Sequence, residues 1–145
     1  MPRAMEMDYA FFADSAASPD RKLYCLGGGF STITLPQVPG RAAFAVVGGF
    51  RFTAADSEKR YEIELRFVDG NDKLVIPPVT LQFQSAPLPT DSDVEITVPT
   101  VTYIQPTFGD AGRYAAQYWL GARMLTQVRL RVEEAAPGSL GPQPN

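Results

Sequence analysis

The chain has 145 residues, of which 45% are hydrophobic and 20% are charged, and its formal net charge is −3. This composition fits one domain with a substantial core and excludes a strongly basic nucleic-acid binder. Histidine is absent and Cys25 is the single cysteine, which excludes imidazole catalysis, Ser-His and Cys-His nucleophile pairs, intrachain disulfides and most side-chain metal sites. We therefore expect a protein that is not an enzyme, with no catalytic, metal-binding or cofactor-binding residues and no cofactor.

The N-terminal part is predicted to contain a flexible start and the first strands. Residues 1–6 lack the apolar core of a signal peptide and are expected to be flexible. Residues 7–16 are a strand candidate that ends at a Ser-Pro-Asp-Arg turn. Residues 22–35 are predicted to form an opening strand and a second strand broken by glycines. Cys25 lies in an apolar run there and is expected to pack as a small core residue.

Two segments of this part have a distinctive sequence: Met-Asp-Tyr-Ala-Phe-Phe-Ala-Asp at 7–14 and Lys-Leu-Tyr-x-Leu-Gly-Gly-Gly at 22–29. With a closing Gly-x-Tyr hairpin at 112–114, they resemble a family of small bacterial and phage-encoded proteins known only as a domain of unknown function. The resemblance spans roughly residues 7–133 and is most specific at the N-terminal segment. It implies a compact β domain and brings no activity with it.

Alternation of apolar and polar side chains predicts the central strands. It covers residues 44–52 and is clearest at 60–67, where every second residue from Tyr61 to Phe67 is apolar. An Asp69-Gly70 turn follows and suits a hairpin whose return begins at residues 74–76.

The next strands are predicted at residues 79–84, 94–98 and 101–104, with a proline-bearing loop at 85–93. Pro99 confines its strand to a sheet edge or to a strand end, because proline cannot donate to a ladder.

The stretch 109–132 is predicted to be the last hairpin, turning at Gly121. Apolar spacing across 114–132 also permits a helix, but residues 126–132 alternate strictly, and a mid-helix glycine would cost about 1 kcal/mol. The set Asp110, Gly112 and Tyr114 resembles the tyrosine corner of immunoglobulin-like domains, which implies that the phenol hydroxyl bonds to upstream backbone. Ala116 stands where such a domain has a cysteine, so the resemblance covers this structural corner alone.

About eight or nine short strands, spaced at intervals near ten residues, predict an all-β fold. We expect an antiparallel β-sandwich, immunoglobulin-like or C2-like, over residues 7–134. Residues 135–145 are rich in Pro and Gly without periodicity and are expected to form a flexible tail.

Three further patterns have structural explanations that we favour over functional ones. The glycine runs at 27–29 and 48–49 lack phosphate-loop spacing and are expected to mark bulges or close sheet approach. Acidic loops could collect calcium ligands at one end of the sandwich, although turns use the same residues; they contain Asp56, Glu58, Asp69, Asn71, Asp72, Asp91 and Asp93. Glu62 and Glu64 share a strand face at a spacing found in glycosidases, but cross-strand ion pairs are the favoured explanation, with Arg60, Arg66, Arg129 and Arg131 as partners.

Trp119 is the side chain that we nominate for a protein interface. Alternation places Tyr114 and Tyr118 inward and Gln117 and Trp119 outward. An outward tryptophan is unusual unless it binds a partner or is covered by a loop or the tail. The candidate interface comprises Trp119, Gln117, Arg129 and Arg131.

These observations favour a non-enzymatic protein-interaction or structural module of a bacterial or phage assembly. Its expected partner is another protein or a second copy of itself, and neither nucleic acid nor membrane. It is expected to be cytoplasmic, because no signal peptide or transmembrane segment is recognisable. The alternative is a small-ligand or carbohydrate-binding module that uses aromatic residues near strand ends.

Overall fold

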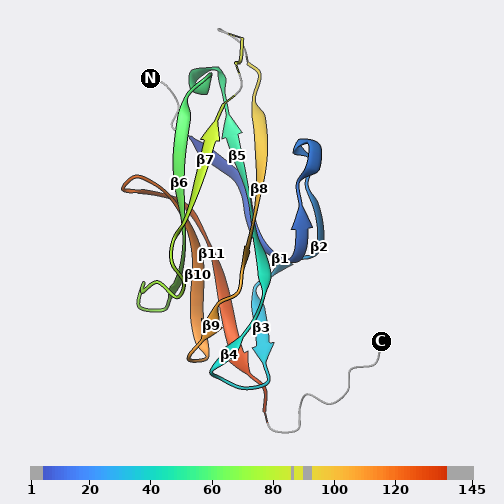
Figure 1. Cartoon of the computed structure of the whole chain (residues 1–145), viewed down its shortest axis with the longest axis vertical. Helices are drawn as coiled ribbons and strands as arrows, with labels where there is room; N and C mark the ends of the chain where they lie inside the picture. Colours follow the sequence, from blue (N-terminus) through green and yellow to red (C-terminus); the bar gives the residue numbers. More distant parts are fainter. Residues whose placement is uncertain (1–4, 86, 90–92, 137–145) are drawn as a thin grey trace.

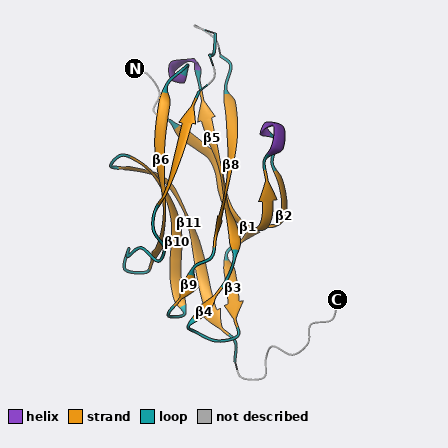
Figure 2. Ribbon diagram, viewed as in Figure 1, coloured by secondary structure: helices purple, strands orange, loops and turns teal. Residues whose placement is uncertain are grey.

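The computed structural model describes residues 5–85, 87–89 and 93–136 as two packed β-sheets (Figure 1 and Figure 2). The first sheet has the strand order β2 (Tyr24–Phe30), β1 (Glu6–Ala17), β5 (Phe44–Phe52) and β8 (Ile96–Ile104). The second has the order β3 (Thr32–Leu35), β11 (Arg123–Glu134), β10 (Gly112–Leu120), β6 (Arg60–Asp69) and β7 (Val79–Gln84). A short pair is formed by β4 (Gly40–Arg41) and β9 (Thr107–Phe108), and two 3-10 turns by η1 (Pro19–Arg21) and η2 (Ala54–Asp56).

The predicted β-sandwich is confirmed, with two differences in detail. The structure has eleven strands, two of which, β4 and β9, are only two residues long and carry no alternation to detect. The pairing of β3 with β11 is parallel, whereas the other strand pairs of the two sheets are antiparallel. Within the described ranges, no helix has the length and hydropathy of a membrane span.

Alternating residues of both sheets meet in an aromatic core. On β6, Ile63, Leu65 and Phe67 are at most 2% exposed, as the alternation predicts. The Phe67 ring lies within 6.5 Å, centroid to centroid, of four other rings, those of Phe12, Phe44, Phe108 and Tyr114. These rings come from both sheets, so Phe67 ties the two layers together.

Gly48 of β5 marks a point where the sheets approach closely, as expected for a strand glycine. A Cβ at this position would lie 2.9 Å from Tyr118 Oη and 2.8 Å from Met7 Cε. Tyr118 is fully buried, and its Oη is the one buried side-chain polar atom of the described residues without a hydrogen-bond partner. The Thr100 hydroxyl donates to Gly48 O at 3.1 Å instead. Burial raises the pKa of the Tyr118 phenol far above its usual range, an effect that nearby Thr100 partly offsets.

The hairpin of β1 and β2 projects from the sandwich and stands beside β8 (Figure 1). β1 pairs with β5 only as far as Ala13 and then continues to Ala17 with β2 as its ladder partner. The pairing of β1 with β2 has a bulge between Phe12 and Ala13. Gly27 and Gly29 adopt φ of 60° and 88°, which glycine tolerates without steric cost. The glycine run therefore shapes this hairpin, as expected for a bulge.

The expectation that Cys25 is a core residue is wrong, because Cys25 is exposed on β2. Its apolar run lies on an edge strand beyond the end of β5, where no second layer covers it. Tyr24 and Leu26 on either side are 57% and 74% exposed. Local hydrophobicity cannot distinguish a core strand from a projecting edge strand.

Element boundaries differ from expectation at the start of the chain. β1 begins at Glu6, and Met5 is 3% exposed, so both residues belong to the domain rather than to a flexible segment. Residues 1–4 and 137–145 lie outside the described residues, which includes most of the expected tail. Ala135 still donates its N–H to Leu35 O at 2.8 Å.

The strand around Pro99 also differs from the prediction. Residues 96–104 form one strand, β8, rather than two, with Pro99 opposite Gly49. β8 is an edge strand, as Pro99 predicted, so the missing N–H costs no interior ladder bond. Residues 74–76 contribute a bridge between Leu74 and Val68, and the next strand of the chain that pairs with β6 is β7.

Candidate functional site

Trp119 lies near the end of β10 on the outer face of the five-stranded sheet, partly exposed. Its Nε1–H donates to Gln117 Oε1 at 3.0 Å. The Arg66 guanidinium of the neighbouring strand β6 lies 4.5 Å from the ring centroid, which is a cation–π contact. The side chains of Gln117 and Arg66 therefore hold the Trp119 indole in one orientation.

Exposed apolar side chains surround this ring. Leu74 is 50% exposed and Met124 is 40% exposed, and the Arg66 Nε lies 2.6 Å from Glu64 Oε1. All of them line one hollow of the sheet face, termed here the Trp119 surface, which comprises Glu64, Arg66, Val68, Asp72, Leu74, Gln117, Trp119, Met124 and Gln127. An aromatic ring, a thioether and a guanidinium are groups that interface cores favour.

The four nominated interface residues share a sheet face but do not form one cluster. Gln117 lies beside Trp119 and is only 8% exposed, since it bonds to both Trp119 and Gln127. Arg129 and Arg131 line a second hollow farther along β11, with Arg113 and Asp69. The two hollows share Val68, Asp72 and Gln127. The outer face thus has an aromatic end and a charged end.

The ion pairs on this face run along strands, so the expected cross-strand pairing is wrong here. Arg66 pairs with Glu64 on β6, and Arg131 Nε lies 3.1 Å from Glu133 Oε1 on β11. Residues two positions apart share a strand face, which lets a long arginine reach the carboxylate.

Cross-strand ion pairs do occur on the four-stranded sheet. Arg51 of β5 binds Asp8 of β1, and its Nη1 lies 3.3 Å from Glu6 Oε2. Thr97 of β8 also donates to Asp8. The Thr97 hydroxyl and the Arg51 guanidinium lower the pKa of the Asp8 carboxyl.

The corner before β10 has the geometry of a tyrosine corner. Tyr114 donates its hydroxyl to Asp110 O at 2.6 Å, and Gly112 has φ of 138°, a value that favours glycine. The Tyr114 ring is 7% exposed and meets Phe108 edge-on at 4.8 Å between centroids. These contacts give Asp110, Gly112 and Tyr114 a structural role at the entry to the strand that carries Trp119.

We expect Tyr114→Phe to lower the free energy of unfolding by about 1 kcal/mol, because it deletes the corner hydrogen bond and keeps the ring. Urea unfolding followed by circular dichroism measures this change. A Tyr9→Phe variant, at a half-buried phenol on the opposite sheet, serves as the control. Equal stability of Tyr114→Phe and wild type would show that the corner bond adds nothing.

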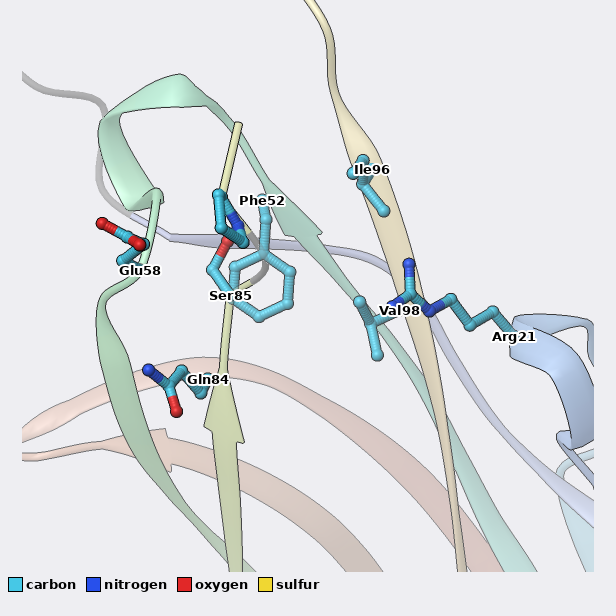
Figure 3. A pocket seen from close by; sticks show the side chains of 8 residues that line it. Arg21, Phe52, Glu58, Gln84, Ser85, Ile96 and Val98 are labelled. Atoms are coloured by element: carbon cyan, nitrogen blue, oxygen red, sulfur yellow. The ribbon is translucent and has the colours of Figure 1, made fainter. Parts of the chain in front are cut away.

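A shallow groove of about 500 Å³ opens between the edge strands β7 and β8 (Figure 3). Phe52, Ile96 and Val98 provide its apolar surface, Arg21 reaches toward it from η1, and Glu58 lies at the other side. Phe52 is an aromatic residue at a strand end, so this groove is where the alternative function of small-ligand binding would be accommodated.

The acidic turn after β6 uses its carboxylate for backbone bonds. Asp69 Oδ1 accepts the N–H of Asn71 at 2.8 Å and that of Lys73 at 3.1 Å, and these bonds lower the pKa of Asp69. Asp56 likewise caps η2 by accepting the N–H of Thr53 at 2.8 Å. In the part of the chain that the structure describes, no three acidic or thiol side chains gather as metal ligands. Asp91 lies outside that part.

Comparison with known protein families matches residues 8–133 to a family of unknown function, DUF6941. The chain belongs to DUF6941. The match covers nearly all the described sandwich, and it confirms the resemblance seen in the N-terminal segments and the closing hairpin. Membership of DUF6941 assigns a β domain and no activity.

Among solved structures, this DUF6941 chain is similar to an immunoglobulin-like protein from Pseudomonas aeruginosa. The identity is 10% and the TM-score 0.45, over 90% of this chain and 98% of that one. The search of curated proteins gave no match.

Of the nine residues of the Trp119 surface in this DUF6941 protein, sequence reasoning nominated only Trp119 and Gln117 for an interface. Arg66 was expected to bind a glutamate, and Leu74 and Met124 were not singled out. Arg66 lies directly beside Gln117 in the β6–β10 register, and Met124 lies beside Trp119 in the β10–β11 register. The strand order of the sheet is needed to find these neighbours, and alternation within a single strand does not supply it.

Proposed function

We propose that this protein is a non-enzymatic β-sandwich module that binds another protein through the Trp119 surface, as part of a bacterial or phage assembly in the cytoplasm. The observation that carries this proposal is a partly exposed tryptophan that Arg66 and Gln117 hold in place on an outer sheet face. A side chain already fixed in one orientation loses little entropy on binding. Large aromatic anchors of this kind supply much of the energy of protein interfaces.

The neighbouring charged end defines the partner further. Arg113, Arg129 and Arg131 line the adjoining hollow together with Asp69 and Asp72, so guanidinium groups outnumber carboxylates there on a chain whose net charge is negative. A protein surface that offers a small apolar pocket beside acidic side chains would complement both ends. Such charge pairing accelerates association and sets the orientation of the partner.

We expect Trp119→Ala to reduce capture of the partner from an extract of the native host by roughly tenfold or more, since truncation of an interface tryptophan removes its largest anchor. The measurement compares proteins retained by immobilised wild type and variant, quantified by mass spectrometry. Met124→Lys, which places a charge in the same surface, is expected to lose the same proteins.

Gln37→Lys is the matched control, because it adds the same charge at an exposed position that lines neither hollow of this face. It should retain every protein that wild type retains. Urea unfolding of each variant checks that the sandwich stays folded. Equal retention by wild type, Trp119→Ala and Met124→Lys would refute the proposed surface.

A further inference from the structure

The outer edge of β2 is an unprotected sheet edge. The two sheets end at β2, β8, β3 and β7. β8 contains Pro99, and β3 has only four residues. β2 has seven residues with no proline and no charge, whereas natural edge strands are commonly blocked by lysine, proline or shortness.

The other edge of the projecting hairpin is already closed. Beyond Ala13 the β1 strand has no ladder partner on the β5 side. There Ala16 donates its N–H to Tyr103 Oη at 2.8 Å, and the same hydroxyl donates to Ala16 O. One tyrosine of β8 therefore satisfies the exposed backbone of β1. Among the described residues, no side chain hydrogen-bonds in this way to the open backbone edge of β2.

These bonds also show which backbone groups β2 presents. Because the N–H and C=O of Ala16 point toward Tyr103, its antiparallel partner Cys25 is not hydrogen-bonded to it and directs its own N–H and C=O to the open edge. Cys25 thus offers a donor and an acceptor to a further strand. The ladder that can form is short, since Gly27 has left-handed φ.

The side chains around this edge are apolar. Tyr24 and Leu26 are 57% and 74% exposed on β2, and residues 23–40 carry no charged side chain. The other proline-free edge strand of comparable length, β7, exposes Thr80, Gln82 and Gln84 and turns its apolar residues inward. Pairing at β2 would therefore bury apolar area, and pairing at β7 would not.

We propose that β2 pairs with β2 of a second copy of this chain, antiparallel about a two-fold axis at Cys25, to form a continuous sheet across a homodimer. In this register Tyr24 of each copy lies opposite Leu26 of the other, so the only two exposed large apolar residues of β2 pair with one another. The strand is self-complementary, which favours a second copy over an unrelated strand.

The absence of charge from the paired segments agrees with this register. The segments that meet in this register, residues 23–27 of each copy, carry no charged side chain, so no charge meets a like charge within the ladder. Two chains of net charge −3 repel each other in general; β2 itself adds no charged side chain to the contact, and the carboxylate of Asp14 on β1 lies beside Gly27. The β2 edge belongs to a different sheet from the Trp119 surface, so this dimer does not depend on the proposed function.

The test is light scattering after size-exclusion chromatography over a concentration series, on wild type, Leu26→Lys, Trp119→Ala and Thr80→Lys. Wild type and Thr80→Lys should approach twice the monomer mass as concentration rises, and Leu26→Lys should stay at the monomer mass, because its two lysines would lie beside the paired strands. A short bismaleimide should link Cys25 to Cys25 in wild type, whose Cα atoms would be about 5.5 Å apart, and not in Leu26→Lys.

A monomeric wild type at every concentration would overturn the dimer and leave the Trp119 surface untouched. A dimer that survives Leu26→Lys would also overturn it. A dimer lost in Trp119→Ala and kept in Leu26→Lys would move self-association to the Trp119 surface. Leu26 is 74% exposed, and circular dichroism of Leu26→Lys should match wild type.

Discussion

Phe67→Ala is expected to lower the free energy of unfolding by about 3–5 kcal/mol, the range for truncation of a buried phenylalanine. The ring is 1% exposed. It stacks on Tyr114 at 6.0 Å, with an interplanar angle of 9°, and meets Phe108 edge-on at 5.9 Å. Its removal leaves a cavity between the two sheets. The sheets cannot close this cavity without displacing other aromatic rings, so relaxation recovers little of the lost stability.

Urea unfolding followed by circular dichroism measures this loss. Phe30→Ala is the matched control, because Phe30 makes aromatic contacts to Phe12 and Phe44 but lies half-exposed at the end of β2. Its loss should be well below that of Phe67→Ala. Equal losses for the two variants would contradict the central place of Phe67 in the core.

Gly48→Ala is expected to cost about 1–3 kcal/mol, as overpacking of a tight core does. The new Cβ would lie 3.0 Å or less from Met7 Cε and from two Tyr118 atoms, and Tyr118 cannot withdraw because it is fully buried. Gly49→Ala is the control on the opposite face of the same strand. There the Cβ would meet the half-exposed Tyr9 ring, which can swing outward, so the loss should be smaller.

A double-mutant cycle with Tyr118→Phe identifies the clash. Tyr118→Phe alone should be neutral or slightly stabilising, because its hydroxyl is buried without a partner. In the Gly48→Ala background it removes one of the contacting atoms, so the double variant should be more stable than the sum of the single changes predicts. If the changes in unfolding free energy are strictly additive in urea unfolding, the Tyr118 hydroxyl is not the group that clashes with a side chain at position 48.

The sandwich could be predicted because its central strands carry local signals. The alternation from Tyr61 to Phe67 predicts both the strand and its buried face. The pattern of Gly112 followed by Tyr114 is typical of a tyrosine corner. Pro99 likewise limited its strand to an edge. These features act within a few residues of the chain, so a single sequence contains them.

What could not be predicted depends on contacts between distant strands. The parallel pairing of β3 with β11 joins segments about 100 positions apart in the chain, and no local pattern encodes it. The exposure of Cys25 follows from where the β1–β5 ladder stops, at Ala13 and Ala45. The contact of Arg66 with the Trp119 ring follows from the β6–β10 register. The outward position of Trp119 was therefore predicted and its surroundings were not, while the role of Trp119 in binding stays a prediction.

The most direct measurement of the proposed function is the apparent mass of the protein in an extract of its native host, by size-exclusion chromatography of wild type, Trp119→Ala and Leu26→Lys at native abundance. Wild type and Leu26→Lys should each elute well above the mass of the same purified protein, and Trp119→Ala should elute at its purified mass. Trp119→Ala eluting in the same large complex as wild type, or wild type eluting at its purified mass, would contradict the proposal.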